Sequence, residues 1–288
     1  MTRVVAGMIS VLGLAVLAGV GCSSKQTAPA PAPQVLEVLK TPTFPVTLDE
    51  AVASEYRTPA NRKRDADRHP LETLQFFGVR PDQTVVEISP SAGWYTEVLA
   101  PYLTPQGHYV AAVVPSGENE HMQQLNATFD AWMVSHPEVR AKAAKIDFDP
   151  ASPLALDPSA LADTVLTFRN VHNWMGNGQA QAAFNNFYKA LKPGGTLGVV
   201  EHRANPTGKL DPKSGYVREA DVIRMAKKAG FRLEAKSEIN ANPKDTKDYP
   251  EGVWSLPPTF AMKEKDHERF AAIGESDRMT LRFVKPAK

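Results

Sequence analysis

Apolar and polar positions repeat along the chain with two different periods, and these predict strands and helices in turn. Runs rich in β-branched residues predict seven strands at residues 84–88, 109–114, 144–148, 164–168, 196–200, 231–239 and 279–284. Apolar residues at helical spacing predict helices at residues 70–77, 94–103, 179–191 and 219–229. Because strands that alternate with helices imply parallel crossover connections, the pattern predicts an α/β domain.

The beginning of the chain has a different pattern. Arg3 precedes an apolar run at residues 4–20, which is too short and too rich in glycine and alanine for a convincing membrane span. The run ends in Leu-Ala-Gly-Val-Gly-Cys and resembles the lipobox of bacterial lipoproteins, with Gly19 where leucine is usual. This resemblance implies a signal peptide at residues 1–21 and lipidation of Cys22. An uncleaved anchor, or an ordinary signal followed by a chance cysteine, is the alternative.

A proline- and alanine-rich stretch follows Cys22, and such a stretch cannot bury apolar surface. We interpret residues 22–45 as a tether and residues 46–288 as one domain. The expected location is the cell envelope, with the domain facing the periplasm and the lipid held in the membrane. Ser23 is not the acidic residue associated with retention at the inner membrane, which weakly favours the outer membrane.

The net charge and the cysteine count of the chain make some classes of function less favoured and exclude others. The 33 basic and 32 acidic side chains leave a formal charge of +1, so no overall field favours a nucleic acid. Cys22 is the only cysteine, which excludes an intramolecular disulfide and a cysteine-based metal cluster. A small molecule or an envelope component is therefore the expected partner, and the sequence leaves the oligomeric state open.

Residues 85–96 read Val-Val-Glu-Ile-Ser-Pro-Ser-Ala-Gly-Trp-Tyr-Thr and resemble motif I of the class I S-adenosylmethionine (SAM)-dependent methyltransferases. In that family a strand leads into a Gly-x-Gly-x-Gly turn, whose backbone amides approach the methionine part of SAM. The resemblance implies that the candidate SAM-binding residues are Glu87, Ser89, Ser91, Gly93 and Trp94. Serine replaces the first two glycines here, and its Cβ disfavours a positive φ.

Further motifs extend the resemblance. The family's second strand normally ends in an acid that binds the ribose, but Val113-Val114-Pro115 stands here, with Glu118 nearby in the loop. Asp147 or Asp149 occupies the place of a residue near the adenine, and capping of a turn is an equal alternative. Residues 163–174, with Asn170 as a candidate SAM contact, resemble the fourth strand and its loop. Residues 191–195, Leu-Lys-Pro-Gly-Gly, resemble the turn before the fifth strand.

The order of these motifs implies a Rossmann-like class I methyltransferase sandwich, with a mostly parallel seven-stranded sheet and an antiparallel last strand. Three strings also resemble a subgroup of bacterial lipoproteins predicted to be methyltransferases. They begin at Arg64 (Arg-Asp-x-x-Arg-His-Pro), Arg169 (Arg-Asn-x-His-Asn-Trp) and Gly274 (Gly-Glu-Ser-Asp-Arg-Met). We carry over no catalytic role from this subgroup to the residues of the three strings.

The candidate catalytic residues are His172, His202 and Arg169, which follow the fourth and fifth predicted strands. An imidazole titrates near neutrality and can act as a general base, but it can equally order a loop through hydrogen bonds. These histidines could also converge with Glu201 and Asp147 on a metal. Because the chain has no short ligand pair such as His-Glu-x-x-His, we expect no metal site.

The sequence thus favours a SAM-dependent methyltransferase whose acceptor it does not identify. A non-catalytic binding module of the envelope is the alternative, because SAM is made and used in the cytoplasm and a fold does not guarantee a function. We expect the charge-dense segment 57–68 and the connection 240–278 to cover the site. The arginines of that segment are candidates for an anion clamp, although such a stretch is usually a solvated face.

Overall fold

The computed structural model describes residues 43–287, which fall within one compact unit. The predicted signal peptide, Cys22 and most of the predicted tether lie outside the described residues. Within residues 43–287, the helices are all too short or too polar to cross a membrane.

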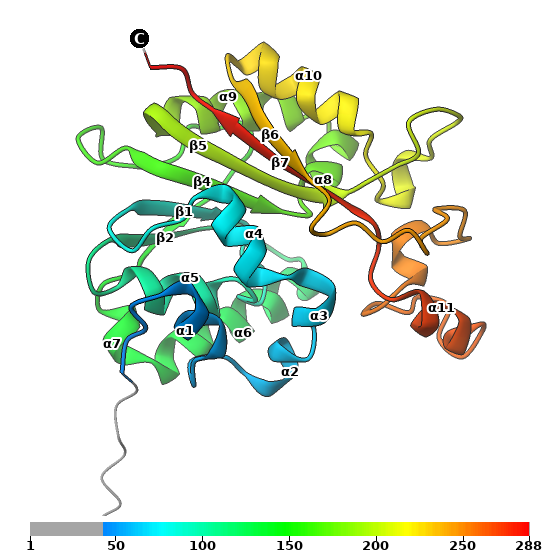
Figure 1. The fold of residues 1–288 in the computed structure, drawn as a ribbon, viewed down its shortest axis with the longest axis horizontal. Coiled ribbons are helices and arrows are strands. Elements are labelled where there is room, and N and C mark those ends of the chain that lie inside the picture. Colours follow the sequence, from blue (N-terminus) through cyan, green and yellow to red (C-terminus); the bar gives the residue numbers. More distant parts are fainter. Residues whose placement is uncertain (1–42, 288) are drawn as a thin grey trace, which may run out of the picture. The chain divides into compact units, whose positions relative to one another are not determined.

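A seven-stranded sheet forms the centre of this unit, in the order β3-β2-β1-β4-β5-β7-β6 (Figure 1). The strands are β1 (Thr84–Ile88), β2 (His108–Val113), β3 (Ala144–Asp147), β4 (Ala162–Phe168), β5 (Leu191–His202), β6 (Arg232–Ser237) and β7 (Arg278–Val284). The first five strands pair in parallel, whereas β7 runs antiparallel to β5 and β6. The predicted α/β class and the antiparallel last strand are confirmed.

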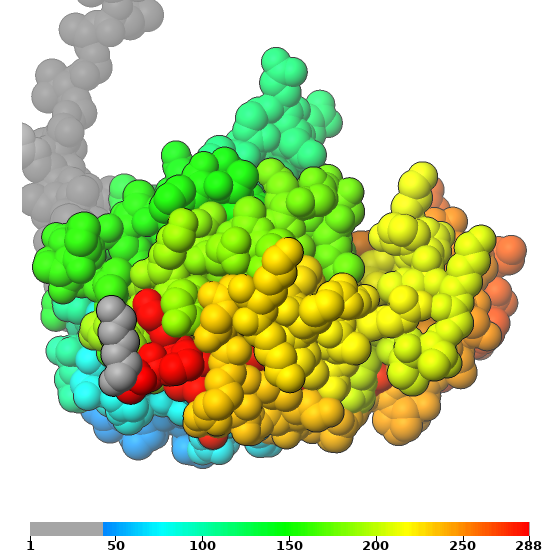
Figure 2. Space-filling model, turned by 90° about the horizontal axis from the view of Figure 1, so that it is seen from above, coloured from blue at the N-terminus to red at the C-terminus, as the bar shows by residue number. Residues whose placement is uncertain are grey.

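Helices cover both faces of the sheet. One face carries α1 (Leu48–Ala53), α4 (Pro70–Phe77), α5 (Thr96–Leu103), α6 (Glu120–Ser135) and α7 (Pro137–Arg140). The other carries α8 (Val171–Gly176), α9 (Ala180–Ala190) and α10 (Glu219–Ala229). Because successive strand residues point to opposite faces, Val85 joins the first core and Val86 the second. Figure 2 shows α10 and β6 covering part of the outer surface.

Of the five remaining short elements within residues 43–287, four lie in the two segments that were expected to cover the site, and Pro212–Ser214 lies between β5 and α10. The five are α2 (Pro59–Arg62), α3 (Asp65–Arg68), the 3₁₀ helices η1 (Pro212–Ser214) and η2 (Gly252–Ser255), and α11 (His267–Ile273). His202 of β5 pairs with Arg278 of β7, so the connection between β6 and β7 returns at the carboxyl edge of the parallel strands. The connection that was expected to cover the site therefore lies at this edge.

The Lys-Pro-Gly-Gly turn lies inside β5 rather than before it. Leu191 pairs with Ala162, and regular pairing resumes only where Thr196 faces Thr164. Gly194 has a φ of 81° within this irregularity. The glycines therefore permit a bulge in a continuous strand, which the sequence presented as a turn.

Candidate functional site

A cavity of about 780 Å³ opens at the carboxyl ends of the parallel strands. The strand order reverses between β1 and β4, and such a switch point is where open α/β sheets bind ligands. Eight of the ten candidate catalytic and cofactor residues line it: Glu87, Ser89, Ser91, Trp94, Arg169, Asn170, His172 and His202. Gly93 and Asp147, which the resemblance also placed among the SAM-binding candidates, do not line the cavity.

The turn after β1 has a backbone conformation that favours glycine, although serine occupies two of its positions. Ser89 has a φ of 51° and Ser91 a φ of 54°, both in the left-handed region, and Gly93 follows with a φ of 88°. A side chain in this region costs roughly 1–2 kcal/mol per residue. The Oγ of Ser89 is also buried without a hydrogen-bond partner in the described part of the chain. Strain and an unpaired polar atom at a cavity wall are typical of a ligand-binding turn.

Glu87 is buried at the end of β1 and holds neighbouring elements together. Its Oε2 accepts hydrogen bonds from Tyr109 Oη at 2.6 Å and from Thr96 Oγ1 at 3.0 Å. Burial raises the pKa of Glu87 to about 7, although these two hydrogen bonds lower it in part. The carboxyl group therefore ties β1 to β2 and α5, and it also lines the cavity.

The end of β2 supplies no acid to the cavity. Val114 lines it, whereas Glu118 is exposed and does not. The start of α6 forms this part of the cavity wall instead, through Asn119, His121, Met122 and Leu125. This wall was not predicted from the sequence, although asparagine is a favoured N-cap residue, and the Asn119 side chain accepts the backbone N–H of Met122 and caps the helix.

Neither Asp147, the last residue of β3, nor Asp149 lines the cavity where an adenine contact was expected. Asp147 is exposed and lies outside the lining. Asp149 accepts hydrogen bonds from Ala151 N at 2.9 Å and Ser152 Oγ at 2.8 Å, and these bonds lower its pKa. The turn-capping alternative therefore describes Asp149, and Pro150 is the residue of this loop that reaches the cavity.

The loop after β4 positions Arg169 and Asn170. Asn170 Nδ2 donates to Ile88 O at 3.0 Å and to Thr167 Oγ1 at 3.2 Å, so the side chain joins the ends of β1 and β4. Arg169 has a φ of 61°, and its backbone N–H donates to Val200 O at 2.7 Å. This strained backbone presents the guanidinium to the cavity.

Glu201 organises the two candidate histidines. Its Oε1 lies 3.1 Å from His172 Nδ1 and accepts the backbone N–H of His202 at 2.7 Å, while Oε2 accepts the backbone N–H of His172. The rings of the two histidines lie 5.4 Å apart. Burial lowers the pKa of His202 well below its usual value, and His172 and Arg169 lower it further. A carboxylate that orients an imidazole is the arrangement of a general base.

The same three side chains are the possible metal ligands in this cavity. One ligand atom from each of His172, Glu201 and His202 lies within 4.8 Å of the others. However, both Glu201 oxygens already accept hydrogen bonds, and His202 Nδ1 lies 2.5 Å from Ser276 Oγ. Arginines also surround the group, and their positive charge opposes a cation. The arrangement favours a hydrogen-bonded cluster, and the expected absence of a metal stays a prediction.

Both covering segments reach the cavity, as the sequence predicted. Arg64 and Arg68 line it from the first segment, and Trp254 lines it from the connection. The Trp254 ring lies 5.5 Å from the His172 ring and 6.2 Å from the His202 ring, both edge-on. Trp254 is therefore a wall beside the histidines, and its other neighbours include Val253 and Tyr216 in a small separate core.

Two arginines at the ends of the charge-dense segment are buried, whereas Arg62 between them is exposed. Arg57 and Arg68 are only 1% and 2% exposed, and both stack on the ring of Trp94. Trp94 Nε1 donates to Asn61 O at 3.0 Å, which fixes the ring against this segment. Sequence analysis left Glu275 and Ser276 without a role, yet they reach the arginines and His202 from the connection.

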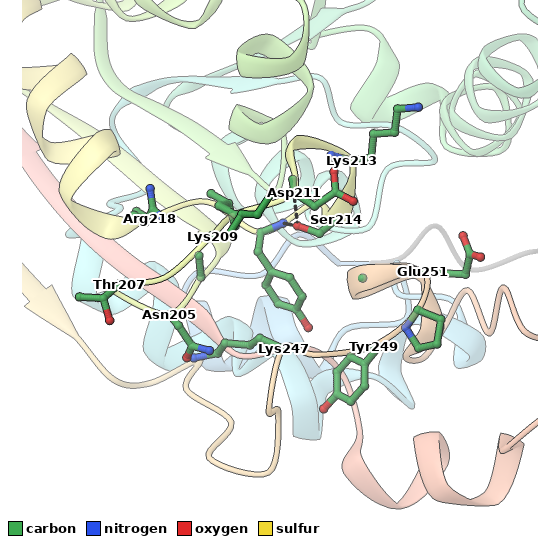
Figure 3. Close-up of a pocket in the computed structure, with 15 residues that line it drawn as sticks. Asn205, Thr207, Lys209, Asp211, Lys213, Ser214, Arg218, Lys247, Tyr249 and Glu251 are labelled. Carbon is green, nitrogen blue, oxygen red and sulfur yellow. Dashed lines mark hydrogen bonds between the residues drawn. The ribbon is translucent and has the colours of Figure 1, made fainter.

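A second, smaller pocket of about 420 Å³ lies between the 204–218 loop and residues 247–252 (Figure 3). Lys209, Asp211, Lys213 and Glu251 line it, so it is polar and of mixed charge. No residue lines both pockets. It contains none of the residues that the sequence singled out for chemistry.

Comparisons with known proteins agree with this architecture. No family model matches the sequence, and no curated protein matches it either. A SAM-dependent methyltransferase from Aquifex aeolicus is similar in structure, with a TM-score of 0.53 and 14% identity, over 83% of this chain and 98% of that one. The (4+2)-cyclase SpnF is also similar, with a TM-score of 0.56 and 15% identity, over 84% of this chain and 92% of that one. The chain therefore has the Rossmann-like fold of the class I methyltransferases.

Proposed function

We propose that this protein is a SAM-dependent methyltransferase acting on an acceptor that is not yet identified. One observation carries the proposal: the turn after β1 holds Ser89 and Ser91 at positive φ beside a large cavity at the switch point of the sheet. A chain with no ligand to accommodate there would gain stability from an unstrained turn. The cavity volume lies within the range of small-molecule sites.

Different residues of the cavity would bind SAM and act on the acceptor in such a reaction. The turn from Ser89 to Gly93 would hold the methionine part of SAM, with Ser89 Oγ as a free polar group at the wall. SAM supplies a methyl group already activated by its sulfonium. The protein has to align the acceptor and, for a weak nucleophile, remove a proton.

His172 is the best-placed general base for that proton. Its Nδ1 contacts Glu201, which leaves Nε2 as the nitrogen without a hydrogen bond in the described residues. Glu201 stabilises the imidazolium that forms when Nε2 takes the proton. His202 stays neutral beside it because burial and the arginines lower its pKa. Trp254 closes this side of the cavity.

A binding module of the cell envelope is the second candidate function. Two observations favour it: serines stand where the family has glycines, and no acid from the β2 end reaches the cavity. The similarity to the cyclase SpnF also illustrates that this fold hosts other chemistry.

Calorimetry of the purified protein with SAM and its demethylated product separates the two candidates. Saturable binding of both ligands supports the transferase, and no heat at millimolar ligand supports the binding module. Replacement of Ala92 by Phe would obstruct the cavity beside the turn after β1 and abolish binding. The matched control, Thr207→Phe in the second pocket, would leave binding unchanged.

We also propose that the mature protein is a lipoprotein anchored through Cys22, with its domain facing the periplasm. The support is the apolar signal before Cys22 and the proline-rich tether after it. Mass spectrometry of the membrane-purified N-terminus tests this proposal. An acylated Cys22 as the first residue agrees with it, and an unmodified Cys22 contradicts it.

A further inference from the structure

Four arginines meet at one wall of the cavity, and we call them the arginine cluster: Arg64, Arg68, Arg169 and Arg278. They come from three distant parts of the chain, namely the α3 region, the loop after β4 and the start of β7. Arg64, Arg68 and Arg169 line the cavity, and Arg278 is 3% exposed behind them. The fold therefore brings Arg169 and Arg278 to two arginines of the charge-dense segment 57–68.

One carboxylate serves this cluster within residues 43–287. Glu275 contacts Arg64 at 2.7 Å, Arg68 at 3.0 Å and Arg278 at 3.0 Å. The nearby Asp277 is engaged elsewhere, with Arg203 and Lys247. Four guanidiniums against one carboxylate leave an excess of three positive charges at the wall. Arg68 and Arg278 are almost fully buried, and buried charges are normally paired, so this excess of positive charge favours the binding of an anion at the wall.

Two guanidiniums are open to that anion. Arg169 makes no hydrogen bond or ion pair through its side chain in the described part of the chain, although it faces the cavity. Arg68 keeps a buried Nη2 with no hydrogen-bond partner there. Burial and the neighbouring guanidiniums Arg278 and Arg64 lower the pKa of Arg169 to about 10, even though Glu275 raises it. An anion between Arg68 and Arg169 would satisfy both groups.

We propose that the arginine cluster binds a carboxylate or phosphate group of the methyl acceptor, which makes the acceptor an anionic small molecule. This inference rests on the proposed methyltransferase function. The charge of SAM argues that the anion is not its own carboxylate. SAM carries an ammonium and a sulfonium beside that carboxylate, so it is a net cation and cannot offset the excess. The acceptor's anionic group would then lie beside His172 and His202, on the same side of the cavity.

Thermal melting of the purified full-length protein tests the anion site with inorganic phosphate as the probe. At matched ionic strength, phosphate should raise the Tm of the wild type by several degrees over chloride, and acetate should show whether a carboxylate suffices. Arg169→Gln should weaken the effect of phosphate at least about tenfold. Without phosphate, its Tm should not fall below that of the wild type, because a charge that is repelled by Arg278 and Arg64 is removed. Arg224→Gln, which alters an exposed arginine of α10, is the matched control.

A phosphate effect that is absent in the wild type, or unchanged in Arg169→Gln, would overturn the site. A second titration, with phosphate in the presence of the demethylated product of SAM, assigns the anion. Independent binding of the two ligands supports the acceptor, whereas competition between them assigns the site to the cofactor's carboxylate and overturns the proposal. If phosphate binds and neither SAM nor its product does, the methyltransferase function fails and the acceptor assignment fails with it, while the anion site stands.

Discussion

The cavity has two unlike walls. The backbone wall consists of the turn after β1, the end of β2 and the start of α6, and it includes Ser89, Ser91, Val114 and Met122. The charged wall consists of the arginine cluster with His172, Glu201 and His202. The first wall depends on backbone conformation and apolar contact, whereas the second depends on buried charges.

This difference separates two tasks. A strained turn can hold the same part of a ligand whichever small residue forms it, because its backbone makes the contacts. Buried arginines and a histidine paired with a carboxylate act instead through charge and proton transfer. We therefore expect substitutions in the charged wall to change acceptor chemistry, and substitutions in the backbone wall to change stability and SAM binding.

The largest expected effect comes from His172→Gln in the charged wall. Methyl transfer from radiolabelled SAM to an envelope extract should fall roughly 10²–10⁴-fold, because a general base is lost. SAM affinity should stay within about twofold, because the backbone wall is unchanged. His121→Gln is the control, since His121 lines the same cavity from α6. If His172→Gln lost methyl transfer and SAM affinity to the same extent, the two walls would not have separate roles.

Glu87→Gln should change how stability depends on pH. The folded-state pKa of Glu87 is raised from 4.5 to about 7, so the native state holds an extra proton between these values and loses stability as the pH rises. Relative to the wild type, the variant should gain up to about 3 kcal/mol between pH 5 and pH 8. Urea unfolding at several pH values measures this gain. The control is Glu72→Gln at an exposed position, and its stability should depend on pH as that of the wild type does. If the stability of Glu87→Gln ran parallel to that of the wild type across this pH range, the raised pKa would be refuted.

The smallest effect is expected from Ser89→Gly and Ser91→Gly in the backbone wall. Each should raise the free energy of unfolding by roughly 0.5–1 kcal/mol, because relief of positive φ exceeds the entropy cost of glycine. SAM affinity should be kept or improved. Ser135→Gly in α6 should instead lower stability, since glycine is a poor helix former. Destabilisation by both turn substitutions would show that the serine side chains are themselves needed there.

Local pattern predicted the sheet well. The expected strands at 84–88 and 279–284, and the helices at 70–77 and 219–229, agree with β1, β7, α4 and α10 to within one residue. These segments have apolar side chains at regular spacing and ordinary turn residues at their ends. The turn in β5 was misplaced because a Pro-Gly-Gly string marks a bulge and a reversal alike.

The candidate site was predictable only in part. Motif I and the loop after β4 could be placed because they follow directly on strands that the pattern identifies. Asp147 was misplaced because the sequence does not show towards which side an acid at the end of an edge strand points, and α6 was missed because its apolar residues are sparse. Nothing in the sequence showed that Glu275 would meet Arg64 and Arg68, which lie more than 200 positions away.

The sequence by itself determined the alternation of strands and helices, and with it the edge of the sheet at which a site would form. It did so because periodicity and turn chemistry act between residues that are near neighbours in the chain. The tertiary structure alone decided which charges meet at that edge and which remain unpaired. Arg57 and Arg68 became buried, Glu201 came to hold His172, and Arg169 was left facing the cavity without a partner in the described residues. Burial and electrostatic pairing depend on contacts between distant segments, and only the folded arrangement fixes those contacts.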